Sequence, residues 1–555
     1  MSNNNIYKKI IEAIKSKGIL KEGELVKLKR EIAIKHKLGK IPTNIEILLS
    51  LSTKERQKYE KALVTKPTRT ISGVTPIAIM TSPEKCPHKN APCITCPGGI
   101  NSHFGNIPQS YTGHEPATMR GIRNNFDPYL QIFNRLEQYI LLGQSCEKVE
   151  LIIMGGTFPA REKTYQNQFI MLAFKAMNDF SNLFFKDNKL DFKKFKTFFE
   201  LPTEELSKAR TQKIQKKILK LKSKSTLKTE QKTNETTKVR CIGLTIETRP
   251  DYAQLEHANL MLEQGCTRVE LGIQSTQEKV LEAMNRGHTT KQTIKAIQTL
   301  KDLGFKINAH FMLGLPKQSN RDIYKLFTKQ EYRPDMLKIY PCMVMPGTEL
   351  EKDYKKGKYK PLTTEQVIKQ LSKFKTKVPK YVRIMRTQRD IPTKVSIAGV
   401  DKTNLRQLLQ NYMKKRKLKC NCIRCNEIKT EITDPKLKVL KYKASKGKEF
   451  FIYIQQKKNI IGFCRLRFPK SQLREEITKD TAIIRELHVY GKATGIKKQG
   501  KVQHKGFGKQ LMQKAEQICK KNKKTKLLVI SGIGVREYYK KIGYKQDGPY
   551  VSKKL

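Results

Sequence analysis

Three cysteines fall within eleven residues of a loop that ends in two glycines, CPHKNAPCITCPGG (residues 86–99). Three thiolates on one short loop can hold a 4Fe–4S cluster and leave its fourth iron without a protein ligand. That open iron can chelate S-adenosylmethionine, whose reductive cleavage supplies a 5′-deoxyadenosyl radical. A CxxC sequence also suits zinc. Taken alone, Cys86, Cys93 and Cys96 leave both kinds of site open.

The elements around this loop favour the cluster. Apolar strands are predicted at residues 149–156, 241–250, 267–275, 305–316 and 336–344, with amphipathic helices such as 165–180 between strands. This alternation is typical of a parallel sheet or barrel, in which functional side chains gather at the carboxyl ends of the strands. Two strands end in residues suited to S-adenosylmethionine, the glycine turn Gly155, Gly156 and Thr157 and the polar pair Glu247 and Arg249.

The pattern of predicted elements changes near Phe450. A hairpin around residues 457–459, a strand ending in ELHVYG, a helix from about residue 509 and a further strand predict a separate α+β domain. Between them, QHKGFG (503–508) is a glycine turn that opens a helix, and its free backbone N–H groups can bind a pyrophosphate. Such a turn is weak evidence alone, but with ELHV before it and VREYYKKIGY after it the pattern fits a GNAT acetyltransferase that binds coenzyme A.

A second cysteine set, KCNCIRC, lies between the two domains and contains Cys420, Cys422 and Cys425. Three thiols at this spacing predict a structural zinc site, with unliganded thiols in a basic linker as the alternative. A fourth ligand is needed and the sequence does not identify it; Cys342 is one candidate and a histidine brought close by the fold is another. The other cysteines are predicted to be small core residues: Cys146, Cys241, Cys266, Cys464 and Cys519.

The 555-residue chain carries 112 Lys and Arg against 50 Asp and Glu, a formal charge of +62. This charge predicts a polyanionic partner, first of all nucleic acid, although a general lysine bias would also produce it. Residues 207–240 hold twelve basic and two acidic residues, and their composition predicts a mobile basic insertion. No apolar run is long enough for a membrane helix, and no export signal is found. A cytoplasmic location is therefore expected.

The motifs resemble those of one family, the catalytic subunit of Elongator. The radical SAM part matches through CPGG, PQSYTGHEPATMR, VELIIMGGTF, GLTIETRPDY and CTRVELGIQS, and the acetyltransferase part through IIRELHVYG, QHKGFG and VREYYKKIGY. The resemblance runs from about residue 66 to residue 555. One departure is the gap of six residues between Cys86 and Cys93, where three is the commonest radical SAM spacing, but the family varies this gap.

The resemblance implies an acyltransferase-class enzyme that installs a 5-carboxymethyl group on the wobble uridine of tRNA, with the anticodon stem-loop and acetyl-CoA as substrates. It also implies an acetyl-CoA site made by Lys148, Glu486, Leu487, His488, Val489, Gln503, Gly506, Phe507, Gly508, Lys509 and Tyr539. Lys148 and Tyr539 are the expected catalytic residues, because a phenol near the thioester can protonate the leaving thiolate. A surface role for Lys148, and core packing for one of Tyr538 and Tyr539, are the plain alternatives.

The predicted architecture is α/β: a basic helical tRNA-binding segment (1–70), a radical SAM partial (β/α) barrel (71–395), a zinc-binding linker (396–440) and a GNAT domain (441–555). Two other functions remain open. One is a protein lysine acetyltransferase with a structural radical SAM domain, and the other is a non-catalytic tRNA-binding module. Other Elongator subunits or a second copy of the chain are possible partners, whereas DNA and membranes are not expected.

Overall fold

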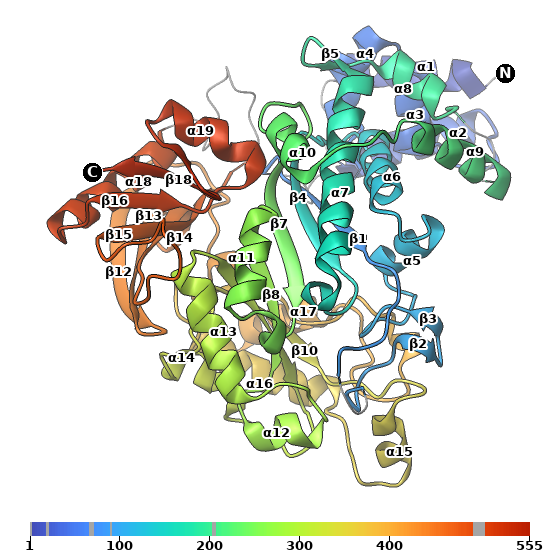
Figure 1. The fold of residues 1–555 in the computed structure, drawn as a ribbon. Coiled ribbons are helices and arrows are strands. Elements are labelled where there is room, and N and C mark those ends of the chain that lie inside the picture. The colour runs from blue at the N-terminus through green and yellow to red at the C-terminus, as the bar shows by residue number, and fades with distance from the viewer. Residues whose placement is uncertain (1–2, 18–21, 66–71, 89–91, 203–206, 492–505) are drawn as a thin grey trace.

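The computed structural model describes residues 3–17, 22–65, 72–88, 92–202, 207–491 and 506–555. Two seven-stranded sheets lie side by side and an N-terminal group of helices lies at the opposite end of the molecule (Figure 1). In the described part of the chain, no helix is both long and apolar enough to span a membrane.

The first sheet is parallel throughout and carries the strands in the order β1-β4-β7-β8-β9-β10-β11. Its strands are β1 (Thr75–Met80), β4 (Lys148–Met154), β7 (Arg240–Thr248), β8 (Cys266–Gln274), β9 (Lys306–Leu313), β10 (Met336–Pro341) and β11 (Arg383–Arg386). Spatial order follows chain order, as in a (β/α) barrel, but β1 and β11 are not paired with each other. The sheet is therefore a partial barrel, as predicted.

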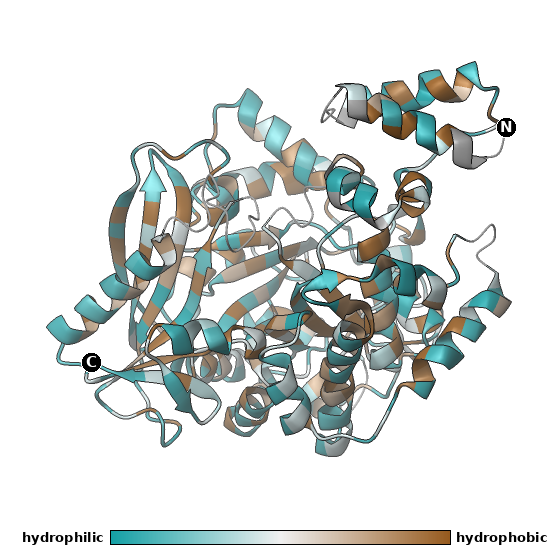
Figure 2. Ribbon diagram, turned by 90° about the horizontal axis from the view of Figure 1, so that it is seen from above, coloured by the Kyte–Doolittle hydropathy of each residue, from teal (hydrophilic) through white to brown (hydrophobic). Residues whose placement is uncertain are grey.

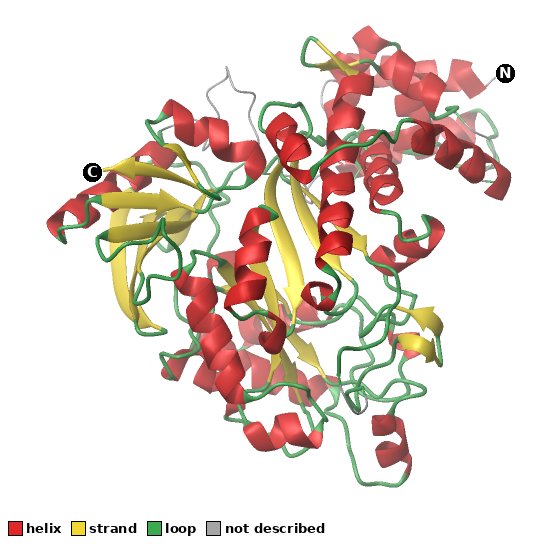
Figure 3. Cartoon of the chain, in the orientation of Figure 1, coloured by secondary structure: helices red, strands yellow, loops and turns green. Residues whose placement is uncertain are grey.

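Helices cover the outer face of this sheet (Figure 3). Those that contact its strands most are α5 (Pro116–Arg123), α6 (Pro128–Leu141), α7 (Lys163–Phe184), α11 (Leu255–Glu263) and α13 (Thr290–Asp302). Shorter or peripheral elements complete the domain: α8 (Phe192–Phe198), α12 (Glu278–Ala283), α14 (Lys325–Thr328), α15 (Glu349–Lys355), α16 (Thr364–Thr376), α17 (Leu405–Lys415), and the ribbons β2 (Gly99–Ser102) with β3 (Gly105–Ile107) and β5 (Phe185–Lys186) with β6 (Lys189–Leu190).

The basic insertion is not a mobile loop, so that prediction is wrong. It forms two helices, α9 (Lys208–Lys220) and α10 (Leu227–Asn234), before β7 begins. The α10 helix packs on α7, where Asn178 Nδ2 donates to Glu230 Oε2 at 2.7 Å and Asn234 Nδ2 donates to Asn178 Oδ1 at 2.7 Å. The lysine-rich composition of the insertion gave no indication of this buried polar contact with α7.

The N-terminal helices are α1 (Asn3–Lys17), α2 (Glu22–Lys35), α3 (Asn44–Ser50) and α4 (Thr53–Tyr59). They alternate hydrophobic and hydrophilic segments (Figure 2) and enclose a small core of their own, with Ile6, Ile10, Leu25 and Ile47 among its buried residues. Reciprocal capping boxes fix the starts of α3 and α4, since each satisfies two free N–H donors. The prediction of a basic helical segment is confirmed for the described residues.

The second sheet has the order β12-β13-β14-β15-β16-β18-β17. Its elements are β12 (Lys436–Ala444), β13 (Gly447–Gln456), β14 (Asn459–Phe468), β15 (Thr481–Val489), α18 (Phe507–Lys521), β16 (Lys526–Val529), α19 (Arg536–Lys541), β17 (Lys545–Asp547) and β18 (Tyr550–Lys554). The β15–β16 pair is parallel, and its pairing runs only from Thr481 to Ile484. Since β16 ends at Val529, residues 485–489 of β15 have no partner on β16, and we call this gap in the pairing the opening between β15 and β16.

Buried charges join the two sheets. On the second sheet, Arg485 Nη2 lies 2.6 Å from Asp335 Oδ1 and Arg467 Nη2 lies 2.5 Å from Asp302 Oδ1, both carboxylates belonging to the first domain. Glu449 accepts from Arg485 at 3.0 Å and completes the network. All five side chains are at most 1 % exposed, and one hydrophobic core runs through both domains. The domains thus form one packed unit.

Candidate active site

The carboxyl ends of the first sheet surround a cavity of about 180 Å³, and the three loop cysteines line its wall. Cys93 Sγ lies 3.5 Å from Arg286 Nη1 and Cys86 Sγ lies 4.0 Å from Arg249 Nη1, so a guanidinium group lies beside each of these two sulfur atoms. The Cys96 sulfur accepts a hydrogen bond from the backbone N–H of Ser110 at 3.3 Å. Burial, together with Cys93, raises the pKa of Cys96 to about 11, which metal binding would reverse.

The spacing of these thiols distinguishes a cluster from a single zinc ion. One tetrahedral zinc with Zn–S bonds near 2.3 Å draws its sulfurs to within about 4 Å of each other. All three cysteines of the loop belong to the described residues, and their sulfur atoms do not come within 4.8 Å of one another as a set. The donor set, its spread and its cationic surroundings fit a 4Fe–4S cluster with one thiolate on each of three irons.

The glycine turn after β4 forms another part of the cavity wall. Gly155 and Gly156 have φ values of +118° and +100°, which favour glycine. A Cβ on Gly155 would lie 2.3 Å from Thr81 Oγ1, and one on Gly156 would lie 3.3 Å from the Gln109 side chain. Gly156 and Thr157 line the cavity directly. The turn therefore exposes backbone where a ligand can approach.

Glu247 and Arg249, at the end of β7, also line the cavity. Tyr111 donates its hydroxyl proton to Glu247 Oε2 at 2.7 Å, and Arg249 pairs with Asp251. Of the residues predicted for S-adenosylmethionine, the structure brings Gly156, Thr157, Glu247 and Arg249 to one cavity beside the cysteines.

Sequence reasoning missed a group of polar residues on β8, β9 and β10 that lines the same cavity. Glu270 Oε2 lies 2.9 Å from His310 Nε2, Lys338 Nζ also contacts this carboxylate, and Asn308 Nδ2 donates to Oε1 at 3.1 Å. Burial opposes ionisation of Glu270, but Lys338 and His310 outweigh it and hold its pKa well below the usual range. The available signal was a polar residue at every second position of otherwise apolar strands, as in RVELG and NAHFM.

This group does not need a metal ion. Glu247, Glu270 and His310 approach one another closely, yet the ammonium group of Lys338 already lies among them, 3.6 Å from Glu247. Burial works against the charge of Lys338, but Glu270 and Glu247 together raise its pKa above the usual range. A protonated lysine thus supplies the positive charge that a metal would bring.

The predicted acetyl-CoA residues of the second domain lie around the opening between β15 and β16. Gly506, in a left-handed conformation at φ +76°, precedes α18, and no side chain caps this helix. As far as the described residues show, the first N–H groups of α18, at Phe507, Gly508 and Lys509, have no partner and are available for an anion. Predicted residue Gln503 lies outside the described residues.

The part of β15 that is not paired with β16, residues 485–489, carries the other predicted acetyl-CoA residues. Glu486 accepts from Arg465 Nε at 2.8 Å, and burial lowers the pKa of His488 to about 4, so this imidazole is neutral. Leu487 and Val489 are partly buried and pack against the hydrophobic core. His488 packs against Tyr490, with ring centroids 4.4 Å apart. The segment thus carries one ion-paired carboxylate, Glu486, and a neutral imidazole, His488, beside the opening.

Lys148 is at the amino end of β4, opposite to the end that carries the cysteines. Its register partner is Arg240 on β7, and a Cβ on Gly534 of the second domain would lie 2.6 Å from Arg240 Cβ. Burial, followed by the charge of Arg240, lowers the pKa of Lys148. Lys148 therefore lies on the side of the barrel that faces the second domain, and not at the cysteine cavity.

The two tyrosines of α19 have different surroundings. Tyr539 is 6 % exposed and its ring lies 5.9 Å from that of Tyr544, whereas Tyr538 is 39 % exposed. A Cβ on Gly508 would lie 3.2 Å from the Tyr538 hydroxyl, which places that hydroxyl at the start of α18. Burial raises the pKa of Tyr539, so its phenol stays protonated at neutral pH.

We expect the two hydroxyls to separate kinetically. Tyr539→Phe should lower kcat for acetyl-CoA turnover by about 10²-fold with little change in KM, because it removes a proton donor. Tyr538→Phe should raise KM for acetyl-CoA several-fold and leave kcat near the wild-type value. Steady-state kinetics of thiol release measures both, and a wild-type kcat in Tyr539→Phe would contradict the assignment.

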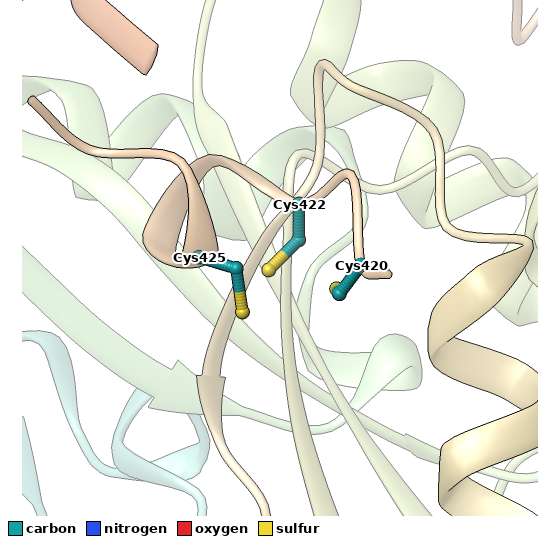
Figure 4. Close-up of side chains that lie close together, drawn as sticks. All are labelled: Cys420, Cys422 and Cys425. Carbon is teal, nitrogen blue, oxygen red and sulfur yellow. The ribbon is translucent and has the colours of Figure 1, made fainter. Parts of the chain in front are cut away.

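The second cysteine set converges as predicted (Figure 4). The sulfur atoms of Cys420, Cys422 and Cys425 all lie within 4.8 Å of one another, and Lys375 Nζ lies 3.6 Å from Cys425 Sγ. Cys342 is buried in a different hydrophobic cluster, with Leu350 among its members. Cys342 is therefore not the fourth ligand, because it is buried in that cluster and is not part of the group formed by the three thiols. The five cysteines predicted as core residues are all buried.

Changing Cys422 to serine is expected to release the metal from this set. Purified wild-type protein should contain about one zinc ion per chain in addition to iron, since structural zinc needs a complete ligand set. Metal analysis by mass spectrometry should show zinc lost in Cys422→Ser and retained in the control Cys342→Ala. Equal zinc in both variants would contradict a site at the linker.

Comparison with known proteins finds the same two kinds of domain. Family models match the ELP3 N-terminal domain at residues 3–71, the Radical SAM superfamily at 203–329, the Radical_SAM C-terminal domain at 334–415 and the Acetyltransferase (GNAT) domain at 484–554. The tRNA uridine(34) acetyltransferase of Methanocaldococcus infernus is 43 % identical over 99 % of this chain and 98 % of its own length. Human Elongator complex protein 3 is 36 % identical over 99 % of this chain and 96 % of its own length.

A solved structure is similar as well. The archaeal M. infernus Elp3 lacking residues 1–46 of its N-terminus aligns with a TM-score of 0.71 and 39 % identity, covering 88 % of this chain and 100 % of that one. The chain belongs to the family of Elongator complex protein 3 and the archaeal tRNA uridine(34) acetyltransferases, acyltransferase-type enzymes that join a radical SAM domain to a GNAT domain.

Proposed function

We propose that this protein is a tRNA carboxymethyluridine synthase, which uses acetyl-CoA to place a carboxymethyl group on carbon 5 of the wobble uridine. The observation that carries the proposal is the presence, in one packed unit, of a three-thiol cavity and an open GNAT strand pair. A simple acetyl transfer needs only the second of these sites. The names of the relatives, which specify uridine 34 of tRNA, support the choice of substrate.

In the radical SAM domain, Cys86, Cys93 and Cys96 would hold the 4Fe–4S cluster, with S-adenosylmethionine against Gly155, Gly156, Thr157, Glu247 and Arg249. When bound, this pair of cofactors supplies a 5′-deoxyadenosyl radical able to remove a hydrogen atom from a methyl group. The chain itself orients the nucleoside: Arg249 and Arg286 provide positive charge beside the thiols, while Tyr340 and Met312 give the cavity an apolar wall.

In the GNAT domain, the start of α18 would bind the pyrophosphate of acetyl-CoA and residues 486–489 would line its pantetheine arm. Tyr539 would protonate the departing thiolate. Lys148 would approach the acetyl group from the barrel, because it lies beside Arg240, which contacts the second domain. The Cys420 set would hold a structural zinc that fixes the linker.

For RNA, the formal charge of +62 and the basic N-terminal helices support binding of the anticodon stem-loop through its phosphates. Phosphate contacts give affinity rather than sequence choice, so the unpaired wobble base would be read inside the cavity. Other Elongator subunits are the protein partners that the name of a relative suggests, and a second copy of the chain is the other partner that we propose. Clustered free thiols suit a reducing compartment, and we propose the cytoplasm.

A protein lysine acetyltransferase is the second candidate, favoured by the GNAT domain alone. The test is an anaerobic reaction of the cluster-containing protein with S-adenosylmethionine, dithionite and acetyl-CoA, in which unmodified tRNA and a lysine peptide compete. We expect a 58 Da carboxymethyl addition on the wobble uridine, a gain of about C₂H₂O₂ fixed by the chemistry of the product, and no acetyl-lysine. Acetyl-lysine with unmodified tRNA would overturn the proposal.

A further inference from the structure

His310 and Glu270 form a side-chain pair that no proposed cofactor uses. His310 Nε2 lies 2.9 Å from Glu270 Oε2, so with a proton on Nε2 the imidazole donates to this carboxylate. The ring of Tyr340 meets that of His310 edge to face, with centroids 5.6 Å apart at 87°. These two contacts fix the orientation of the imidazole within the cavity wall.

The other ring nitrogen is free for a substrate. Among the described residues, Nδ1 of His310 has no hydrogen-bond partner, and the side chain is 13 % exposed on the cavity. Glu270, which holds the far side of the ring, is only 1 % exposed. The geometry is that of a histidine whose inner nitrogen is anchored and whose outer nitrogen faces a ligand, an arrangement that suits proton transfer.

Other groups on this cavity are poor proton acceptors. Tyr340 and Lys338 carry raised pKa values, about 12 for Tyr340 through burial, and stay protonated. Glu247 already accepts from Tyr111 at 2.7 Å. Glu115 accepts from the Thr112 backbone at 3.0 Å and from two threonine hydroxyls. Asp390 is paired with Arg386. Among the described cavity residues, His310 is the one with an uncommitted lone pair on an ordinary base.

The proposed reaction requires such a base. When a carbon radical derived from the acetyl methyl adds to C5 of uracil, a C–C bond forms, the unpaired electron moves to C6, and C5 keeps its hydrogen. Restoring the C5=C6 double bond requires the loss of that electron and of the C5 proton. A 4Fe–4S cluster held by Cys86, Cys93 and Cys96 would supply the one-electron acceptor that this loss requires, and the proton requires a base.

We propose that His310 is the catalytic base that takes the C5 proton of the uridine on Nδ1, while Glu270 stabilises the imidazolium through Nε2–H. This inference rests on the proposed carboxymethylation. The proposal gives each group one role. His310 transfers the proton, and Glu270 positions the imidazole from behind without touching the uracil.

The test compares His310→Asn, His310→Ala and the control His257→Asn, a histidine on helix α11 away from the cavity. Each protein is given CD₃-labelled acetyl-CoA and tRNA. We expect His310→Asn to transfer deuterium to 5′-deoxyadenosine within about threefold of wild type but to form carboxymethyluridine about 10²-fold more slowly, since that is the usual contribution of a general base. Added imidazole should restore product formation in His310→Ala, and His257→Asn should match wild type.

A measurement without the cluster completes the test. In cluster-free protein, the ¹⁵N resonance of His310 Nδ1, assigned by its loss in His310→Asn, should shift when an anticodon stem-loop with wobble uridine is added. Full product formation by His310→Asn, or parallel loss of tRNA binding and deuterium transfer without imidazole rescue, would overturn the role of His310 alone. A wild type that makes no carboxymethyluridine would overturn the proposed function, and this role with it.

Discussion

Cys93→Ala is expected to abolish carboxymethyluridine formation while acetyl-CoA binding remains at the wild-type level. Cys93 lines the cavity with its sulfur 3.5 Å from Arg286, whereas Lys148 lies at the opposite end of the first sheet and the other acetyl-CoA residues belong to the second domain. Loss of one of three thiolates leaves an incomplete ligand set for the cluster. The broad absorbance of the cluster near 400 nm and its iron content should therefore fall with the activity.

A buried cysteine provides the matched control. Cys241, on β7, is fully buried and its thiol contacts the Gly243 carbonyl at 3.5 Å. Cys241→Ala should retain iron, absorbance and product formation. If Cys93→Ala also kept its iron and its activity, the assignment of the loop cysteines as cluster ligands would fail.

The second large effect is expected at the domain interface. Asp335→Asn should lower the free energy of unfolding by about 3–5 kcal/mol, because removing one partner of a buried ion pair leaves the others uncompensated. Asp335 accepts from Arg485 at 2.6 and 2.8 Å and lies 3.6 Å from Lys301 Nζ. Urea unfolding followed by circular dichroism measures the change. The control Asp434→Asn, whose partner Lys436 is exposed, should change stability by less than about 1 kcal/mol.

The same carboxylate predicts a pH dependence. Burial opposes the charge of Asp335, but Arg485 and Lys301 prevail and depress its pKa far below the value of about 3.9 in an unfolded chain. A depressed folded pKa gives stability that is present above the unfolded pKa and is lost as the pH falls below it. Wild-type stability should therefore decline below about pH 4, and this part of the decline should be absent in Asp335→Asn. Identical pH profiles would contradict the network.

Part of the architecture was accessible from sequence because it depends on local patterns. Strands β7 and β8 are rich in apolar and β-branched residues, and the glycine turn after β4 requires positive φ values that only such a sequence supplies readily. The cysteine loop follows a strand, which fixes its place at one end of the sheet. These features depend on residues that are adjacent in the sequence.

The remaining features depend on contacts between distant residues. His310 and Glu270 are 40 positions apart and looked like interruptions of apolar strands. Asp335 and Arg485 are separated by 150 positions, and no local pattern marks either as an interface residue. The insertion at α9 and α10 read as mobile because its charges are local, whereas its support, Asn178, lies on α7. Composition alone does not reveal such partners.

The central claim is that a hydrogen atom leaves the acetyl methyl before the group joins uridine, and deuterium tracing tests it most directly. With CD₃-labelled acetyl-CoA and unmodified tRNA, mass spectrometry should find two deuterium atoms in the carboxymethyl group of the wobble uridine and one in 5′-deoxyadenosine. An acetyl group that carries all three deuterium atoms, on uridine or on lysine, with unlabelled 5′-deoxyadenosine, would show plain acyl transfer and contradict the radical route.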